Sequence, residues 1–240
     1  VHEGSARFLD AHTLEITPRQ EAPFSLRAEQ ILIATGSRPY RPPGLDFSHP
    51  RVCDSDTILR FAGTPFSVTI YGAGVIGCEY ASIFLNMGCK VTLVNTQDRL
   101  LSFMDEEIAE ALSYHLRDQG CIIRHNEQFE SLEAREHDVL LNLKSGRRIK
   151  SDLLLWANGR TGNTDGLNLE SVGMVPNQRG QIEVDEHYRT KVPGIYAAGD
   201  VIGPPALASA AYQQGSHVGS HILDGSSKPP RSELTPSGIY

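Results

Sequence analysis

The sequence has few cysteines, no long apolar run and no excess of basic residues, and each absence excludes a class of protein. Its four cysteines, Cys53, Cys78, Cys89 and Cys121, form no CxxC pair. This argues against a disulfide framework or a zinc site and favours a reducing cytosol, so we expect a cytoplasmic protein. No apolar run reaches 18 residues, so we expect no membrane-spanning helix. The net charge of −7 makes general binding to nucleic acid or to an anionic membrane unfavourable.

The chain also lacks an initiator methionine and opens on Val1. Its first residues have neither the basic start nor the apolar run of a signal peptide. The length of 240 residues suits one large domain or two small ones, and the hydrophobic fraction of 40% is sufficient for a core. Wholesale disorder is thereby excluded, and we expect a folded piece of a longer protein.

Apolar stretches bounded by glycine, proline and polar turns predict an α/β fold. Continuous apolar strands such as residues 31–36 are typical of parallel sheets, in which both faces of the strand are buried. A helix over residues 105–119 has an apolar stripe formed by Ile108, Leu112 and Leu116. The order β-α-β-α-β around it indicates a doubly wound parallel sheet. The predicted strands are residues 6–9, 13–16, 24–26, 31–36, 67–71, 90–94, 121–124, 139–143, 147–150, 153–159 and 194–200, and the other predicted helices are residues 78–87 and 206–223.

A short and degenerate internal repeat links two parts of the chain. An offset of 123 residues places Leu26 on Ile149 and Gly36 on Gly159. In both places short strands lead into an apolar strand that ends in small residues and glycine. The match is equally compatible with two related nucleotide-binding units and with coincidence.

The strongest chemical signal is the pattern Gly72-x-Gly74-x-x-Gly77 between a predicted strand and a predicted helix. In this setting Gly72 permits a tight turn, Gly74 lets a pyrophosphate approach the backbone, and Gly77 lets the helix pack closely on the strand. The N–H groups at the start of the helix then hold the pyrophosphate. The pattern predicts a dinucleotide-binding turn.

The next strand ends at Asn95, where such units read the ribose of adenosine. An acidic residue there bonds the 2′-hydroxyl of NAD, whereas a nearby arginine favours the 2′-phosphate of NADP. Asn95 is uncharged and repels neither group, and Arg99 offers a cation. Arg99 is equally compatible with an ordinary solvated surface charge. The sequence therefore predicts a site that accepts both NAD(H) and NADP(H).

A second candidate site lies where the strand over residues 194–200 ends in Gly199-Asp200. A carboxylate at the carboxyl edge of a parallel sheet is well placed to accept hydrogen bonds from the hydroxyls of a ligand. The same dipeptide is also common in ordinary turns and helix caps. The residues alone leave both interpretations open.

Together these motifs resemble the flavoprotein disulfide reductase family over nearly the whole chain. The resemblance is carried, in chain order, by Ala34-Thr35-Gly36, the glycine turn followed by Glu79, Gly159-Arg160 and the block 190–200. Within the family, the sequences of residues 71–84, 158–165 and 207–212 are similar to those of members that use both nicotinamide nucleotides. Most relatives have proline where this chain has Thr161-Gly162.

The resemblance implies an α/β fold in which a Rossmann-like dinucleotide-binding domain is inserted into a second, incomplete FAD-binding domain. The implied domains are residues 1–37 (first part of the FAD-binding domain), 38–160 (NAD(P)-binding), 161–225 (second part of the FAD-binding domain) and 226–240 (linker to a missing interface domain). In the family, the residue matching Asp200 binds the ribityl chain of FAD, and Leu207-Ala208 face the flavin. The implied cofactor-binding residues are Gly72, Gly74, Gly77, Glu79, Asn95, Gly159, Asp200, Leu207 and Ala208.

The resemblance further implies an FAD-dependent oxidoreductase that passes hydride between NADPH and NAD⁺. No acid, base or nucleophile is needed for the hydride step, and none is assigned; no metal site is expected, because the nine histidines show no ligand spacing. A disulfide reductase such as dihydrolipoamide dehydrogenase remains an alternative, because the family's CxxxxC pair would lie before Val1. A non-catalytic nucleotide-binding or redox-sensing module is a further alternative. For the intact protein we expect a homo-oligomer, and for the fragment alone no activity.

Overall fold

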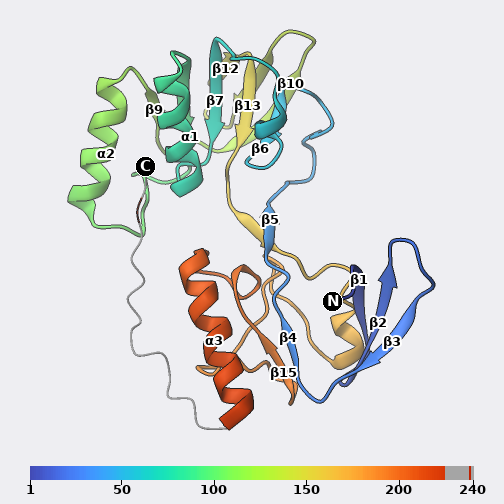
Figure 1. The fold of residues 1–240 in the computed structure, drawn as a ribbon. Coiled ribbons are helices and arrows are strands. Elements are labelled where there is room, and N and C mark those ends of the chain that lie inside the picture. The colour runs from blue at the N-terminus through green and yellow to red at the C-terminus, as the bar shows by residue number, and fades with distance from the viewer. Residues whose placement is uncertain (225–237, 239–240) are drawn as a thin grey trace. The chain divides into compact units, whose positions relative to one another are not determined.

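The computed structural model describes residues 1–224 and residue 238 (Figure 1). Within it, residues 1–38 and 160–224 form one compact unit and residues 39–159 form a second. The second unit therefore interrupts the first along the chain. Both contain parallel strand pairs and helices, which confirms the α/β class. The predicted linker over residues 226–240 lies outside the described residues, apart from residue 238.

The second unit is built on a five-stranded parallel sheet. Most of its side chains are apolar, and the strand Leu153–Trp156 is buried throughout. Burial of both faces explains why this strand is apolar at every position. In spatial order the strands are β6 (Val52–Asp54), β13 (Leu153–Trp156), β7 (Ser67–Tyr71), β8 (Lys90–Val94) and β9 (Ile122–Arg124).

Two helices cover one face of this sheet. Helix α1 (Val75–Asn86) follows β7, and Gly88, with φ of +81°, ends it as a left-handed cap. Helix α2 (Glu106–Asp118) begins at Asp105, whose carboxylate accepts from the N–H groups of Glu107 and Ile108. The predicted stripe of α2 is partly wrong. Leu116 is fully buried and Leu112 partly, but Ile108 is 56% exposed, because this helix packs beside the edge strand β9.

The other face of the sheet is covered by strands, not by the helices that a doubly wound sheet would place there. Leu154 and Trp156 of β13 pack against Val139 and Leu141 of an antiparallel sheet. Trp156 stacks on Tyr71 with ring centroids 4.4 Å apart. This sheet comprises β10 (Phe129–Ala134), β11 (Val139–Leu143) and β12 (Arg148–Ser151), of which sequence analysis missed β10.

The first unit begins with an antiparallel meander, whose three strands were predicted, and continues into a parallel strand pair. The meander comprises β1 (Gly4–Asp10), β2 (Thr13–Pro18) and β3 (Phe24–Arg27), and the parallel pair comprises β4 (Ile31–Ile33) and β15 (Ile195–Ala197). Leu32 is 39% exposed, so the expectation of two buried faces is wrong for β4. Among the described residues β4 pairs only with β15, and the small core lies on one side of the pair.

Shorter elements complete this unit and its boundary. Helix α3 (Ala208–Asp224) follows β15, close to its predicted bounds. Strands β5 (Ser37–Pro39) and β14 (Arg160–Gly162) pair at the point where the chain leaves and re-enters the unit. Among the described residues, this unit also contains the 3₁₀ turns η2 (Leu169–Val172) and η3 (Asp200–Ile202), and the second unit contains η1 (Ile58–Arg60). No helix in the described part of the chain combines the length and apolarity required to cross a bilayer.

The repeat seen in the sequence corresponds to the same local architecture in both units. In each, a three-stranded antiparallel meander leads into a strand with a parallel partner, β4 in one unit and β13 in the other. Gly36 and Gly159 follow these strands, and both have positive φ, +70° and +99°. The correspondence favours two related units over coincidence.

Candidate dinucleotide-binding sites

The three glycines of the turn between β7 and α1 meet three different steric demands. A Cβ atom on Gly72 would lie 2.5 Å from the carbonyl oxygen of Ala157, and one on Gly77 would lie 1.8 Å from that of Gly72. Neither position accepts a side chain without moving backbone. A Cβ atom on Gly74 would meet no atom within 4 Å. The first and last glycines thus serve backbone packing, whereas Gly74 leaves open space at the start of α1.

The beginning of α1 has the features of an anion-binding turn. Gly74 is the N-cap residue and provides no side-chain hydrogen bond to the first turn. The turn lies at the carboxyl end of the central strand β7, where open α/β sheets bind ligands (Figure 1). Glu79, one turn further along α1, is half-buried. This arrangement suits a pyrophosphate approached by backbone N–H groups.

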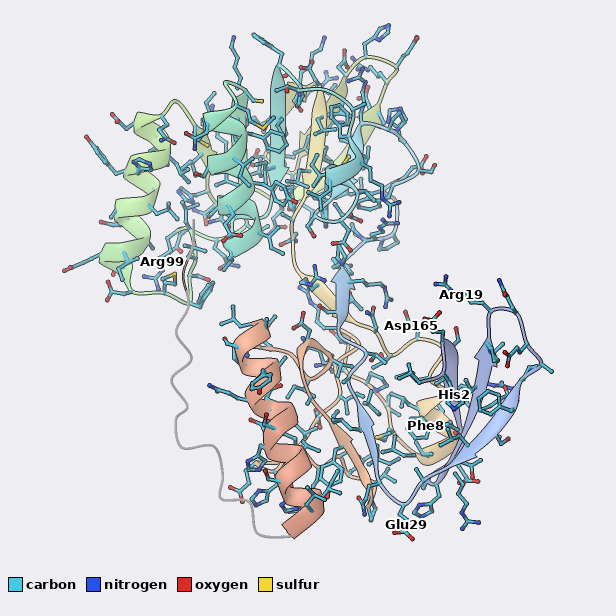
Figure 2. The ribbon with its side chains drawn as sticks, viewed as in Figure 1. His2, Phe8, Arg19, Glu29, Arg99 and Asp165 are labelled. Carbon is cyan, nitrogen blue, oxygen red and sulfur yellow. The ribbon has the colours of Figure 1, made fainter. Side chains whose placement is uncertain are left out.

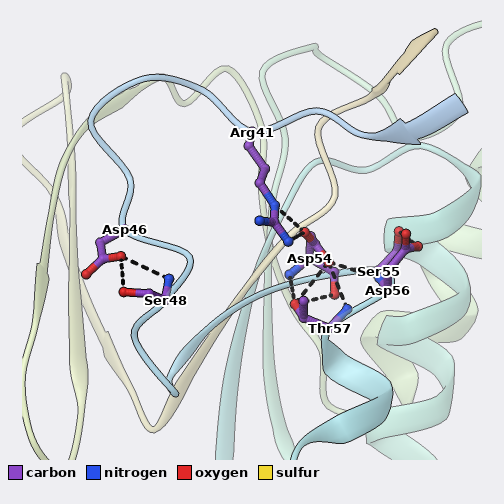
Figure 3. A network of polar contacts seen from close by, with 7 residues as sticks. All are labelled: Arg41, Asp46, Ser48, Asp54, Ser55, Asp56 and Thr57. Atoms are coloured by element: carbon purple, nitrogen blue, oxygen red, sulfur yellow. Dashed lines mark hydrogen bonds and ion pairs between the residues drawn. The ribbon is translucent and has the colours of Figure 1, made fainter. Parts of the chain in front are cut away.

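The loop after β6 is fixed by a buried carboxylate (Figure 3). Asp54 is fully buried and accepts from Arg41, from the N–H groups of Asp56 and Thr57, and from the Thr57 hydroxyl. Burial alone would raise the pKa of Asp54, but these hydrogen bonds hold it below its usual value. The next residue of the loop, Ser55, accepts from the hydroxyl of Tyr80 on α1, at 3.0 Å. Asp54 therefore fixes the loop whose Ser55 carbonyl contacts α1, a role that its sequence position did not reveal.

Asn95 lies at the end of β8, as predicted, but its side chain faces inward. It is only 5% exposed, and its amide nitrogen lies 2.6 Å from the carbonyl oxygen of Arg99 and 3.2 Å from Nδ1 of His125. Its amide oxygen accepts from the N–H of Gln97 at 3.2 Å. Asn95 thus holds together the loop that follows β8.

Two more groups at this edge carry charge or can acquire it. His125 directly follows β9, at the same sheet edge as Asn95, and it is half-buried. The edge rule that singled out Asn95 also applies to His125, so this residue could have been found from the sequence. Arg99, labelled in Figure 2, lies 3.8 Å from Glu106 in the first turn of α2 and donates to the carbonyl oxygen of Ser102.

In the first unit, Asp200 begins η3, and Ala198 and Gly199 separate it from β15. Its carboxylate accepts from the hydroxyl of Ser37 at 2.8 Å, and that hydroxyl accepts from Nε of Arg160 at 2.7 Å. Arg160 also donates to the carbonyl oxygen of Ser37. These contacts join the strand ends on both sides of the crossing and orient the Asp200 carboxylate. Sequence reasoning singled out Asp200 and missed Ser37.

A groove in the same unit runs along the carboxyl ends of β4 and β15. Apart from Leu32, Ser37 and Asp200, every side chain that lines it is alanine or glycine, so a ligand can approach the backbone closely. Gly199, beside Asp200, has φ of +79°, and its N–H donates to the side chain of Gln214 on α3. The remaining lining residues are Ala34, Gly36, Ala198, Ala211 and Gly215.

The predicted site residues divide between the two units. Gly72, Gly74, Gly77, Glu79 and Asn95 belong to the second unit, where the glycine turn and Asn95 lie at the ends of neighbouring strands. Gly159 also belongs to the second unit and accepts from the N–H of Tyr40.

The rest of the predicted site belongs to the first unit. There, Asp200 lines the groove, while half-buried Leu207 and exposed Ala208 lie at the start of α3.

The cysteines are chemically quiet. All four are free and buried. Burial raises the pKa of Cys78 to about 12 and that of Cys121 to about 11. Because the thiolate is the reactive form, a redox role is disfavoured for both. Among the described residues, no group of histidine, cysteine and acidic side chains is arranged to hold a metal ion.

Comparisons with known proteins agree on the family to which this chain belongs. The model of the family described as pyridine nucleotide-disulphide oxidoreductase matches residues 1–215. Soluble pyridine nucleotide transhydrogenases of Chromohalobacter salexigens and Pseudomonas aeruginosa are 56% and 57% identical over 99% of this chain. Each match covers 51% of the relative, so the chain spans about half the length of these curated relatives.

Solved structures agree with this grouping. The Cu(II) complex of a mutant form of RclA, an HOCl-induced flavoprotein disulfide reductase from Escherichia coli, superposes with a TM-score of 0.89 at 31% identity. That match covers 99% of this chain and 54% of the other. LpdA from Mycobacterium tuberculosis gives a TM-score of 0.86 at 30% identity, covering 96% of this chain and 49% of that one.

Proposed function

We propose that this chain, which belongs to the pyridine nucleotide-disulphide oxidoreductase family, is part of a flavoprotein. This flavoprotein would pass hydride between NADPH and NAD⁺. The observation that carries the proposal is the glycine turn of the second unit together with the uncharged Asn95 at the next strand end. A carboxylate at that strand end would repel a 2′-phosphate, and its absence leaves both nucleotides acceptable. The names of the transhydrogenase relatives support the same reaction.

We assign the nicotinamide nucleotide to residues 38–160. The open space at Gly74 would admit the pyrophosphate, while Gly72 and Gly77 keep the turn and helix close enough for backbone N–H groups to bind it. Half-buried Glu79, on the same helix, would lie toward the nicotinamide. Gly159, at the end of the strand beside β7, would line the same edge of the sheet.

We assign FAD to residues 1–37 and 161–225, together with a part of the protein that this chain does not include. FAD would supply the isoalloxazine ring that carries hydride between the two nucleotides. The groove of alanine and glycine residues fits the close approach of a large planar cofactor. Within the described chain, Ser37 is the side chain that donates to Asp200, which leaves the second carboxylate oxygen available for a ribityl hydroxyl. Leu207 and Ala208 would face the flavin.

The protein's contribution to hydride transfer is then binding and orientation, without a side-chain acid, base or nucleophile. The buried, free cysteines support a reducing compartment, and we place the protein in the cytoplasm. The intact protein is proposed to be a homo-oligomer. A disulfide reductase is less well supported, because the relatives at 56–57% identity are named transhydrogenases.

The test is NADPH-dependent reduction of thio-NAD⁺ by the purified, FAD-loaded intact protein. We expect turnover without a disulfide substrate. Turnover that requires lipoamide would favour a disulfide reductase, and absence of NADPH oxidation would favour a non-catalytic module. The variant Gly74→Val should abolish turnover by filling the open space at the turn. Gly219→Ala, at an equally open and exposed glycine of α3, is the matched control and should keep parental activity.

A further inference from the structure

The side-chain amide of Asn95 has only one orientation that satisfies its neighbours. A flipped amide would place its oxygen against the carbonyl oxygen of Arg99 and its nitrogen against the N–H of Gln97. The nitrogen therefore donates to Arg99 and to Nδ1 of His125. Because Nδ1 must accept that hydrogen bond, it carries no proton, and the His125 imidazole in this arrangement is neutral.

This geometry limits what Asn95 can offer to a nucleotide. Both hydrogens of its amide nitrogen are used within the protein, and only the second lone pair of its oxygen remains. A 2′-hydroxyl can donate to that lone pair. A 2′-phosphate, which is an acceptor, finds no partner on Asn95. With neutral His125, the strand end thus suits the ribose of NAD(H) better than that of NADP(H).

Charged groups from several elements bear on the imidazole of His125. Burial and the charge of Arg117 on α2 lower its pKa, whereas Asp98 and a hydrogen bond with the backbone of Gln97 raise it. The balance leaves the pKa below its ordinary value. The neutral form seen in the geometry is therefore the form that these surroundings favour near neutral pH.

We propose that His125 is a positioning residue that makes the choice between NADPH and NADH depend on pH. Protonation at Nδ1 removes the acceptor from Asn95 Nδ2. It also places a cation 3.2 Å from that amide. The cation favours NADPH, because it attracts the charged 2′-phosphate and has no charge to attract on the 2′-hydroxyl of NADH. The proposal rests on the proposed function, because it assumes that adenosine binds at this strand end.

The test measures kcat/KM for NADPH and for NADH between about pH 5.5 and 8.5, across the range in which histidine titrates. For the parent protein, the ratio of kcat/KM for NADPH to kcat/KM for NADH should rise about tenfold as the pH falls through the titration of His125. A tenfold change corresponds to a shift of about one unit in the pKa of His125 when NADPH binds. In His125→Asn, the Asn side chain can still accept from Asn95 but cannot become charged. Its ratio should lack this tenfold rise and change only as far as protonation of the 2′-phosphate itself changes it.

The control and the contradicting results are distinct. His137→Asn replaces a histidine whose side chain is 81% exposed, and its ratio should follow the parent. Protonation of the 2′-phosphate, with a pKa near 6, affects all three proteins equally, so only the difference between them counts. A parental pH dependence in His125→Asn would overturn the proposal. Failure of the parent to use either nucleotide would instead overturn the proposed function.

A second measurement avoids dependence on the folding of a variant. The ring proton signals of His125 in the parent protein are titrated by NMR with 2′,5′-ADP or with 5′-ADP bound. The titration midpoint of His125 should move to higher pH with 2′,5′-ADP, because the 2′-phosphate stabilises the imidazolium. Equal midpoints with the two ligands would overturn the proposal.

Discussion

Replacing Asn95 by alanine should destabilise the second unit, although the residue lies at a sheet edge. The change removes hydrogen bonds to the carbonyl oxygen of Arg99, to Nδ1 of His125 and from the N–H of Gln97. Each contributes about 0.5–1.5 kcal/mol, and buried partners that lose their bond add a desolvation penalty. The sum is a loss of about 2–4 kcal/mol in the free energy of unfolding of this unit.

The matched control is Asn142→Ala. Asn142 also has three side-chain hydrogen-bonding partners, Ser131, Glu133 and Arg148, but these bonds are exposed to solvent. Its loss should cost about 0.5 kcal/mol or less. The contrast tests burial, because the number of partners is the same.

Fluorescence of Trp156 during urea unfolding is the assay. Trp156 is the single tryptophan of the chain, and it lies buried in β13 of the second unit, so its signal reports that unit selectively. Similar small losses for Asn95→Ala and Asn142→Ala would refute the inward orientation of Asn95. The loop after β8 would then be held by other contacts.

Three further predictions concern the glycine turn, the flavin contact and the thiols. Gly77→Ala should lower the free energy of unfolding of the second unit by about 3 kcal/mol, because the added Cβ would lie 1.8 Å from the Gly72 oxygen. Trp156 fluorescence measures the loss, and an unchanged stability would contradict the close packing. In the intact protein, Asp200→Ala should weaken FAD affinity by about one to two decades, because a hydrogen bond to a charged group is lost. The flavin absorbance that remains after dialysis measures retention, and undiminished retention would show that Asp200 does not bind FAD. Native Cys78 should react with a disulfide reagent near neutral pH far more slowly than in urea, since its pKa is raised to about 12; equal rates would contradict its burial.

Local patterns in the sequence were sufficient to locate most elements that build the sites. Strands β7 and β8 have the predicted bounds because each is rich in β-branched and apolar residues and is followed by glycine or a polar residue. The glycine turn was recognisable because strand, glycines and helix occur together. The steric crowding at Gly72 and Gly77 explains two of its three glycines physically.

The errors arose where burial depends on distant partners. Ile108 fits the helical stripe, but α2 packs beside an edge strand and leaves this side chain exposed. Leu32 belongs to an apolar run, yet within the described residues its strand pairs only with β15. Strand β10 was missed because nearly all its side chains are exposed or partly exposed, which leaves no apolar pattern.

The partners of a polar side chain were equally beyond the sequence. The strand end identified Asn95 as the position, but not that its amide would be committed to Arg99, Gln97 and His125. The Ser37–Asp200 contact joins residues 163 apart in the chain, which no local pattern records. Positions at a sheet edge could thus be predicted, whereas side-chain directions required the fold.

Equilibrium binding of NADH and NADPH to the same protein tests the central claim most directly. The claim is that the glycine turn and the uncharged end of β8 form one site for both nucleotides. Isothermal titration calorimetry of the intact protein should show that each nucleotide binds and that the two compete. Their dissociation constants should agree within about tenfold at neutral pH, because position 95 carries the uncharged Asn95 and no carboxylate that would repel the 2′-phosphate. Binding of only one nucleotide, or independent binding of both without competition, would contradict the claim.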